Sequence, residues 1–214
     1  MLGRPIARTL AASVLCLALA PLPVSAVSFT YQGVVTSGQS DAFGIGLNDP
    51  VTGMLSFDDG TGANAILTIM AGGQTWTAQN FTPRVVAENP TTDLFLAQQD
   101  GPGLGGPASG PTIPGQPLGT IALNGRESGG ILTPPTLPDF AAFQQLVAVS
   151  GLTGDVFYCS SVGIGCNVSP INSFFFTVTE INNGTAAAIP LPGSGILLLA
   201  GLGALAAARF ARQT

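Results

Sequence analysis

The chain has 214 residues, of which 29 are glycine, 17 are proline and only 8% are charged; this composition disfavours long surface helices and favours short strands joined by turns. The absence of histidine and lysine excludes Ser-His-Asp and Cys-His catalysis as well as Schiff-base and Ser-Lys schemes. All 11 acidic residues lie between Asp41 and Glu180, where only Arg84 and Arg126 are basic, so this body carries a net charge of −9 and would repel nucleic acid.

The N-terminus has the three-part order of a secretory signal peptide. Arg4 and Arg8 precede an apolar run over residues 10–20, and two prolines and the small-residue pattern Val24-Ser25-Ala26 follow that run. The run is too short to span a bilayer comfortably. The sequence therefore predicts a helical signal peptide over residues 1–26, with cleavage after Ala26.

Alternation of apolar and polar residues predicts a series of strands in the exported body, residues 27–184. The pattern is clearest over residues 51–57, 65–71 and 74–81, which are separated by turn residues and form a predicted antiparallel meander. The remaining predicted strands cover residues 28–36, 84–88, 93–98, 119–124, 155–159 and 173–181.

Two other segments of the body have a different character. Residues 101–117 contain six glycines and five prolines without apolar periodicity, which is typical of a long loop or a mobile flap. Asp139 precedes Phe140, Phe143 and other apolar residues at helical spacing, so it is expected to cap one short helix packed on the sheet. With so many short strands, we expect a mostly β, two-sheet antiparallel β-sandwich of jelly-roll type.

The segment Asp58-Asp59-Gly60-Thr61-Gly62-Ala63-Asn64 has two interpretations. Aspartate and glycine suit a tight hairpin turn. Alternatively, Asp58, Asp59 and Asn64 supply oxygen ligands for Ca²⁺, although the segment lacks the spacing of an EF-hand. We expect no other metal or cofactor.

Aromatic residues and cysteines in the body each suggest a role. Trp76, Tyr31 and Tyr158 either belong to the core or form a platform on which a sugar ring stacks. After removal of the signal, Cys159 and Cys166 are the remaining cysteines, and in an oxidising compartment they are expected to form a disulfide. A catalytic pair of carboxylates is conceivable among 11 acids, but no spacing singles one out.

The C-terminus contains a second apolar segment. After a short linker over residues 185–188, the stretch from Ile189 to Ala208 is uncharged, and Arg209 and Arg212 follow. Its 20 residues would reach about 30 Å as a helix, which is the thickness of a bilayer's hydrocarbon core, so we expect a C-terminal transmembrane helix. The alternative is a helix buried in the core, since glycines and alanines make the segment only moderately apolar. The arginines beside both apolar segments predict that the two ends face the cytoplasm and that the acidic body lies outside.

The tail over residues 189–214 resembles a known class of sorting signal. Its short proline motif Ile189-Pro190-Leu191-Pro192-Gly193, single hydrophobic span and basic end are similar to PEP-CTERM tails of the VPLPA type, although the first and last motif positions depart from that pattern. The resemblance implies a Gram-negative bacterium, recognition by an exosortase-type membrane protease, and association with exopolysaccharide.

These observations lead to a functional hypothesis. We expect a non-enzymatic cell-surface or extracellular-matrix protein, anchored in the inner membrane with its body outside the cytoplasm or released to the surface after tail processing. The alternative is a carbohydrate-binding module, assisted by calcium or not, that is associated with exopolysaccharide.

Overall fold

A computed structural model describes residues 26–160 and 166–184 of the chain. The predicted signal peptide up to residue 25, the linker 185–188 and the sorting tail 189–214 therefore lie outside the described residues. Among the residues that are described, no helix is both long and apolar enough to cross a membrane.

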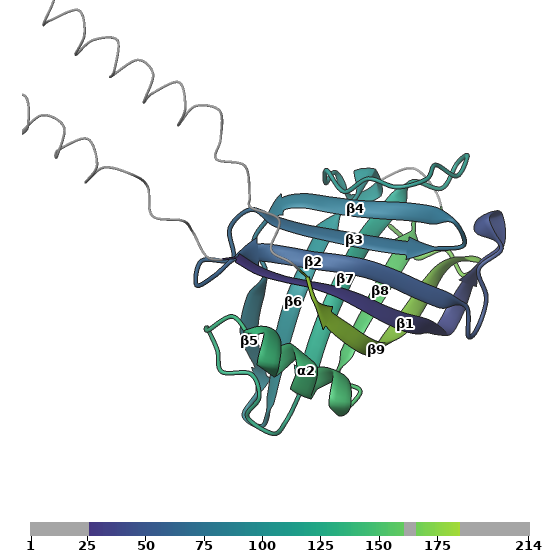
Figure 1. The fold of residues 1–214 in the computed structure, drawn as a ribbon. Helices are drawn as coiled ribbons and strands as arrows, with labels where there is room; N and C mark the ends of the chain where they lie inside the picture. Colours follow the sequence, from purple (N-terminus) through teal and green to yellow (C-terminus); the bar gives the residue numbers. More distant parts are fainter. Residues whose placement is uncertain (1–25, 161–165, 185–214) are drawn as a thin grey trace, which may run out of the picture.

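The described residues form nine strands, one α-helix and two short 3-10 helices (Figure 1). Each predicted strand is confirmed, with ends that differ by a few residues, because alternating apolar side chains mark the strands clearly. The strands are β1 (Ala26–Ser40), β2 (Pro50–Asp58), β3 (Ala65–Ala71), β4 (Gln74–Phe81), β5 (Arg84–Asn89), β6 (Thr92–Asp100), β7 (Leu118–Glu127), β8 (Leu152–Tyr158) and β9 (Asn172–Asn183). The helix α2 covers Phe140–Ala148, and the 3-10 helices cover Asp41–Phe43 and Pro102–Leu104.

All nine strands belong to one antiparallel sheet, in the order β4-β3-β2-β1-β9-β8-β7-β6-β5. The predicted two-sheet jelly-roll sandwich is therefore wrong, whereas the mostly β, antiparallel character is confirmed. The single sheet curls so strongly that β1–β4 cross over β6–β8 (Figure 1). Its two halves enclose a core as two separate sheets would, and this explains why the alternation of the strands suggested a sandwich.

The first and last strands close the arrangement. β1 pairs with β9 from Phe29 opposite Asn183 to Ser40 opposite Asn172, with two register shifts along the way. This pairing joins the meander β1–β4 to the meander β5–β9. Because β1 and β9 are antiparallel, the start of the described chain and its end lie next to each other at one end of the sheet.

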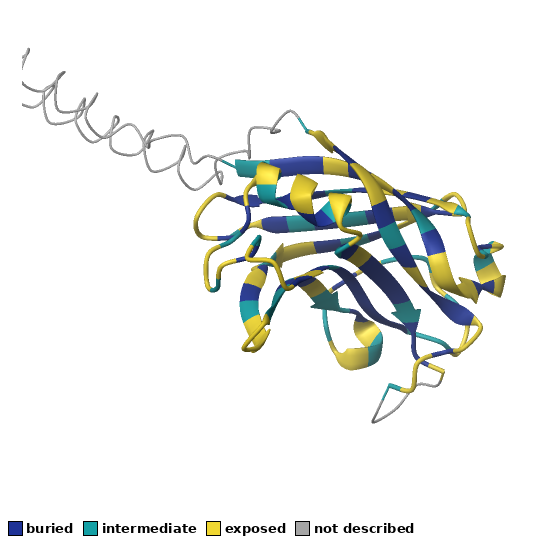
Figure 2. Ribbon diagram, turned by 90° about the horizontal axis from the view of Figure 1, so that it is seen from below, coloured by how far each residue is buried: buried dark blue, intermediate teal, exposed yellow. Residues whose placement is uncertain are grey.

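The core fills the inside of the curl, where α2 closes one side (Figure 2). Phe143 of α2 is fully buried, and its ring lies 4.5 Å from that of Phe29, 5.0 Å from that of Phe95 and 6.4 Å from that of Phe57. Phe29 and Phe57 belong to one half of the sheet and Phe95 to the other. The helix therefore holds the two halves together through aromatic contacts.

The connector from β7 to α2 is ordered by a buried carboxylate. Glu127 accepts hydrogen bonds from the backbone N–H groups of Gly129 and Leu132, the latter at 2.8 Å. Burial by itself would raise the pKa of Glu127, but the surrounding backbone N–H groups outweigh it and lower the pKa. At the end of the connector, Asp139 accepts from the N–H of Ala142 at 2.8 Å, which confirms the predicted helix cap.

Truncation of Phe143, whose ring lies among the aromatic residues of the core, should destabilise the protein. Phe143→Ala is expected to lower the free energy of unfolding by about 3 to 5 kcal/mol, because it leaves a cavity among three aromatic rings. Urea unfolding followed by fluorescence measures the change. Val149→Ala is the matched control: Val149 is 61% exposed at the end of the same helix, so its truncation should cost less than about 0.5 kcal/mol. Equal losses in the two variants would contradict the proposed core.

Candidate functional site

The aromatic residues considered as a sugar platform lie in the core. Trp76, Tyr31 and Tyr158 are all at most 1% exposed. The indole N–H of Trp76 donates to the Tyr158 hydroxyl at 2.9 Å, and that hydroxyl donates to the carbonyl of Pro111 at 2.6 Å. The Tyr31 hydroxyl donates to the carbonyl of Thr68 at 2.8 Å. Their polar atoms are thus satisfied inside the protein, and these rings present no face to a ligand.

Hydrogen bonds hold the glycine- and proline-rich segment 101–117 against the sheet. Besides the bond from Tyr158 to Pro111, Ser109 exchanges two backbone hydrogen bonds with Thr77 of the edge strand β4. Gln116 accepts from the side chains of Ser169 and Asn172. Part of the free edge of β4 is therefore covered, which protects it from pairing with other chains.

The segment considered as a calcium site closes on itself through hydrogen bonds. Gly62 donates its N–H to the carbonyl of Asp58, and Asp58 donates its N–H to the carbonyl of Ala63. The side-chain amide of Asn64 donates to Oδ2 of Asp58 at 2.8 Å, while Asp59 is exposed. Asn64 therefore acts as a hydrogen-bond donor and directs no oxygen at Asp58, an arrangement that favours the hairpin turn over a calcium site. Across the described ranges, no group of three or more Cys, Asp or Glu side chains could hold a metal.

A polar groove lies on the outer face of the sheet, at a corner. We call it the corner groove; it has a volume of about 290 Å³ and is lined by Thr82, Arg84, Leu96, Gln98 and Asp100. The register explains its position. β5 begins at Arg84, opposite Leu96, whereas β6 continues to Asp100, so the last residues of β6 have no partner in β5.

The chain leaves the sheet at this corner. β4 ends at Phe81 and β5 starts at Arg84, so that only two residues connect the opposite edges of the curled sheet. Gln99 of β6 spans the gap: its side-chain amide donates to the carbonyl of Gln79 at 2.8 Å, and its side-chain oxygen accepts from the Gln79 N–H at 3.1 Å. The Gln99 side chain thereby makes the two hydrogen bonds to Gln79 that the backbone of a neighbouring strand would otherwise make. Gln98 and Asp100, on either side of Gln99, line the groove.

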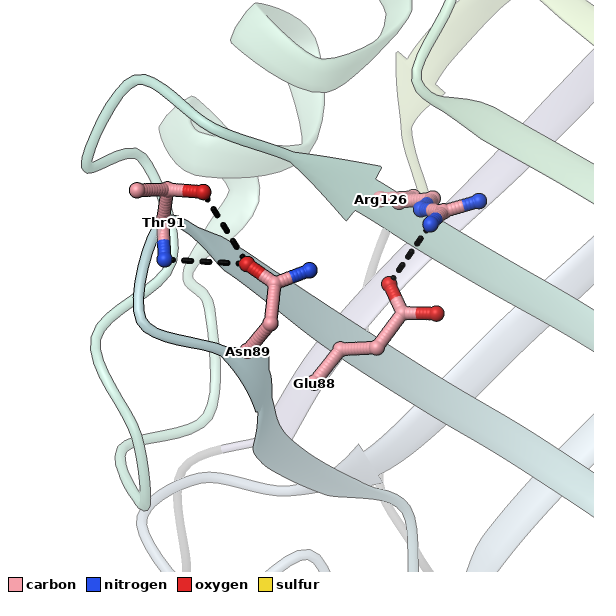
Figure 3. A network of polar contacts seen from close by, with 4 residues as sticks. All are labelled: Glu88, Asn89, Thr91 and Arg126. Carbon is pink, nitrogen blue, oxygen red and sulfur yellow. Dashed lines mark hydrogen bonds and ion pairs between the residues drawn. The ribbon is translucent and has the colours of Figure 1, made fainter.

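The groove contains two charged side chains, those of Arg84 and Asp100. Arg84 forms no ion pair with any described residue, whereas Arg126, the other arginine of the body, binds Glu88 at 2.9 Å in an exposed pair (Figure 3). Oδ1 of Asp100 accepts from the Thr120 hydroxyl at 2.9 Å. The groove therefore offers a guanidinium at one end and a positioned carboxylate at the other.

A second polar group on the outer face is buried. Asp155 of β8 is only 8% exposed, and its Oδ2 accepts from the side-chain amide of Asn124 on β7 at 3.2 Å. Oδ1 of Asp155 and Oδ1 of Asn124 are also buried, and neither has a hydrogen-bond partner within the described structure. Burial raises the pKa of Asp155 to about 7, although the hydrogen bond from Asn124 opposes the shift. The neutral acid is the form that this environment favours.

Sequence analysis missed both outer-face groups. Arg84 and Asp155 are the first residues of two predicted strands, next to turns where charged residues are commonly solvated. Alternation alone assigns them to the outer face, but their surroundings depend on which strands lie beside them.

The predicted disulfide is confirmed: Cys159 and Cys166 are bonded at the end of β8.

Comparison with known proteins identifies no relative: no family model, no curated protein and no solved structure matches the chain. The functional argument therefore depends on the residues of the chain itself.

The buried acid should make stability depend on pH. In the unfolded chain the pKa of Asp155 returns to its ordinary value near 3.8. Between about pH 4 and pH 7 the folded protein then binds more protons than the unfolded chain, so the contribution of Asp155 to the free energy of unfolding is present at low pH and falls as the pH rises. At about 1.4 kcal/mol per pKa unit, the loss reaches at most about 4 kcal/mol above pH 7.

Asp155→Asn keeps the shape of the side chain and removes its titration. This variant should be more stable than the native protein at pH 8, and its urea midpoint should fall less between pH 4.5 and pH 8. Asp59→Asn, at an exposed position of a turn, is the control and should reproduce the native pH dependence. A native slope retained in Asp155→Asn would contradict the assignment.

The disulfide should contribute moderately to stability. Replacing Cys159 and Cys166 together with serine is expected to lower the free energy of unfolding by about 2 to 2.5 kcal/mol, because the bridge closes only a short loop. A reducing agent should bring the native protein to the level of the variant in urea unfolding and leave the variant unchanged. A variant as stable as the oxidised native protein would contradict this estimate.

Proposed function

We propose that the protein is a non-enzymatic envelope protein, exported by its signal peptide and anchored or sorted through its C-terminal tail. The observation that supports this most directly is the pairing of β1 with β9. Phe29 lies opposite Asn183, and Ser28 lies beside Gly184, so both ends of the body leave the sheet at the same place. Figure 1 shows the start of β1 and the end of β9 close together.

A common exit point suits a domain held at a membrane. The two terminal apolar segments then begin at one end of the sheet, so neither has to cross the surface of the domain to reach the bilayer. Removal of the signal peptide leaves the tail as the single tether. The rest of the sheet, including its acidic outer surface, faces away from the membrane and is available to the cell exterior.

The tail motif defines the expected partner. Resemblance to PEP-CTERM tails implies that Pro190, Leu191 and Pro192 are recognised by an exosortase-type protease in the inner membrane, which would transfer the body to the cell surface or the extracellular matrix. The linker over residues 185–188, between the body and the motif, is made of Thr185 and three alanines.

An enzymatic function has little chemical support. The chain contains no histidine and no lysine, so acid–base work would fall to carboxylates. Of these, Asp155 is buried, so a substrate has little access to it, and Asp100 is bonded to Thr120.

Deletion of the tail tests the anchor. In the native host, the full chain is expected in the membrane or surface fraction, whereas a chain ending at residue 188 is expected in the medium or periplasm, because it lacks the apolar span. Immunoblots of the fractions measure the distribution. Equal release of the two forms would rule out retention by the tail.

A second variant separates anchoring from sorting. Changing Pro190 and Pro192 to alanine keeps the tail apolar and removes the motif. This variant should stay in the inner membrane with its tail uncleaved if a protease recognises the motif. Normal processing of the variant would contradict recognition by an exosortase-type protease and leave simple anchoring as the function of the tail.

A further inference from the structure

We propose that the corner groove binds a single ring of an uncharged polysaccharide. The proposal deepens the carbohydrate-binding alternative and does not depend on how the body is tethered. It moves the ligand site from the buried aromatic residues to the outer face, where Arg84, Gln98 and Asp100 lie along one depression with Thr82 and Leu96.

The lining matches the hydrogen-bonding pattern of a sugar. Each hydroxyl of a sugar both donates and accepts, and neighbouring hydroxyls present two such groups side by side. The guanidinium of Arg84 offers donors in a planar fork, Asp100 offers acceptors, and the amide of Gln98 offers both. A hydrocarbon chain would leave several of these polar groups unpaired, at a cost in binding.

The groove also has an apolar surface. Leu96 is partly buried and contributes the apolar part of the lining, directly opposite Arg84 in the strand register. A pyranose ring carries C–H groups on its faces and hydroxyls around its edge. With its face on Leu96, its edge would meet Arg84 on one side and Gln98 on the other.

Charge favours a neutral ligand. The body has a net charge of −9, from 11 acidic residues and two arginines, and Asp100 is itself part of the groove. An anionic polysaccharide would be repelled by the body as a whole. Arg84 therefore serves as a hydrogen-bond donor to hydroxyls more than as a partner for carboxylates.

One polar group of the groove, Asp100, is held in place before any ligand arrives. The carboxylate of Asp100 is bonded to Thr120, and its backbone carbonyl accepts from the N–H of Ala108 at 2.9 Å. Gln99, between the two polar residues of β6, is fixed to Gln79 by two hydrogen bonds. Such preorganisation reduces the entropy lost on binding.

Size limits the ligand to a short segment. At about 290 Å³ the groove lies just below the range of about 300 to 1,000 Å³ found for ligand pockets. It therefore accommodates one ring of a longer chain, and the affinity of one site should be modest. A tethered protein in many copies would gain avidity from repeated contacts with the same polysaccharide.

Affinity electrophoresis of the full-length protein in detergent tests the site. Gels contain soluble β-glucan, galactomannan, xylan or dextran, with polygalacturonate as the anionic probe. At least one neutral polysaccharide should retard the protein, and Arg84→Ala should weaken that retardation about tenfold, as expected for loss of a hydrogen bond to a charged group. Asp100→Asn, which preserves size, should weaken it as well.

Arg126→Ala is the matched control, because Arg126 is the other arginine of the body and belongs to a different strand, outside the groove. Retardation of the Arg126→Ala variant should equal that of the native protein, and circular dichroism should confirm that all variants are folded. Equal effects of Arg84→Ala and Arg126→Ala, retardation by polygalacturonate alone, or no retardation by any neutral probe would overturn the proposal. Any of these results leaves the fractionation test of the tail unaffected, so failure of the two proposals can be distinguished.

Discussion

The pairing of the first strand with the last is the constraint on which the rest of the structure depends. Residues separated by most of the body, such as Phe29 and Asn183, lie side by side only because β1 and β9 form one antiparallel ladder. That ladder joins two meanders into one curled sheet and brings the two chain ends together. It also leaves β4 and β5 as the two edge strands of the sheet, connected by Thr82 and Pro83. This connection creates the corner where the groove lies.

The distribution of side chains between the two faces shapes the functional interpretation. The inner face takes nearly all the large aromatic rings, and the contacts of Phe143 with both halves of the sheet stabilise the curl. Even the polar atoms of Trp76 and Tyr158 are used internally. The proposed recognition of a sugar therefore falls to the outer face, where the polar side chains of the corner groove suit a ligand rich in hydroxyl groups.

Much of the local structure could be predicted from the sequence, and the reasons are local too. Alternation over residues 51–57 placed β2, and the spacing of apolar residues behind Asp139 placed the helix and its cap. The number of sheets could not be predicted, because the inner face of a curled sheet has the same alternation as one face of a sandwich. The corner groove could not be predicted, because Arg84 and Asp100 line the same depression only through the register of β5 on β6.

The sequence by itself determined the positions of the strands, the acidic body and the two terminal apolar segments, because each depends on residues close together in the chain. It also identified Cys159 and Cys166 as partners, since they are the two cysteines that follow the predicted signal peptide. Only the tertiary structure decided that one sheet curls on itself, that Trp76 is buried and that Asp155 is shielded from water. These outcomes follow from pairing between distant strands, and alternation specifies which face a side chain occupies but not which strand lies beside it.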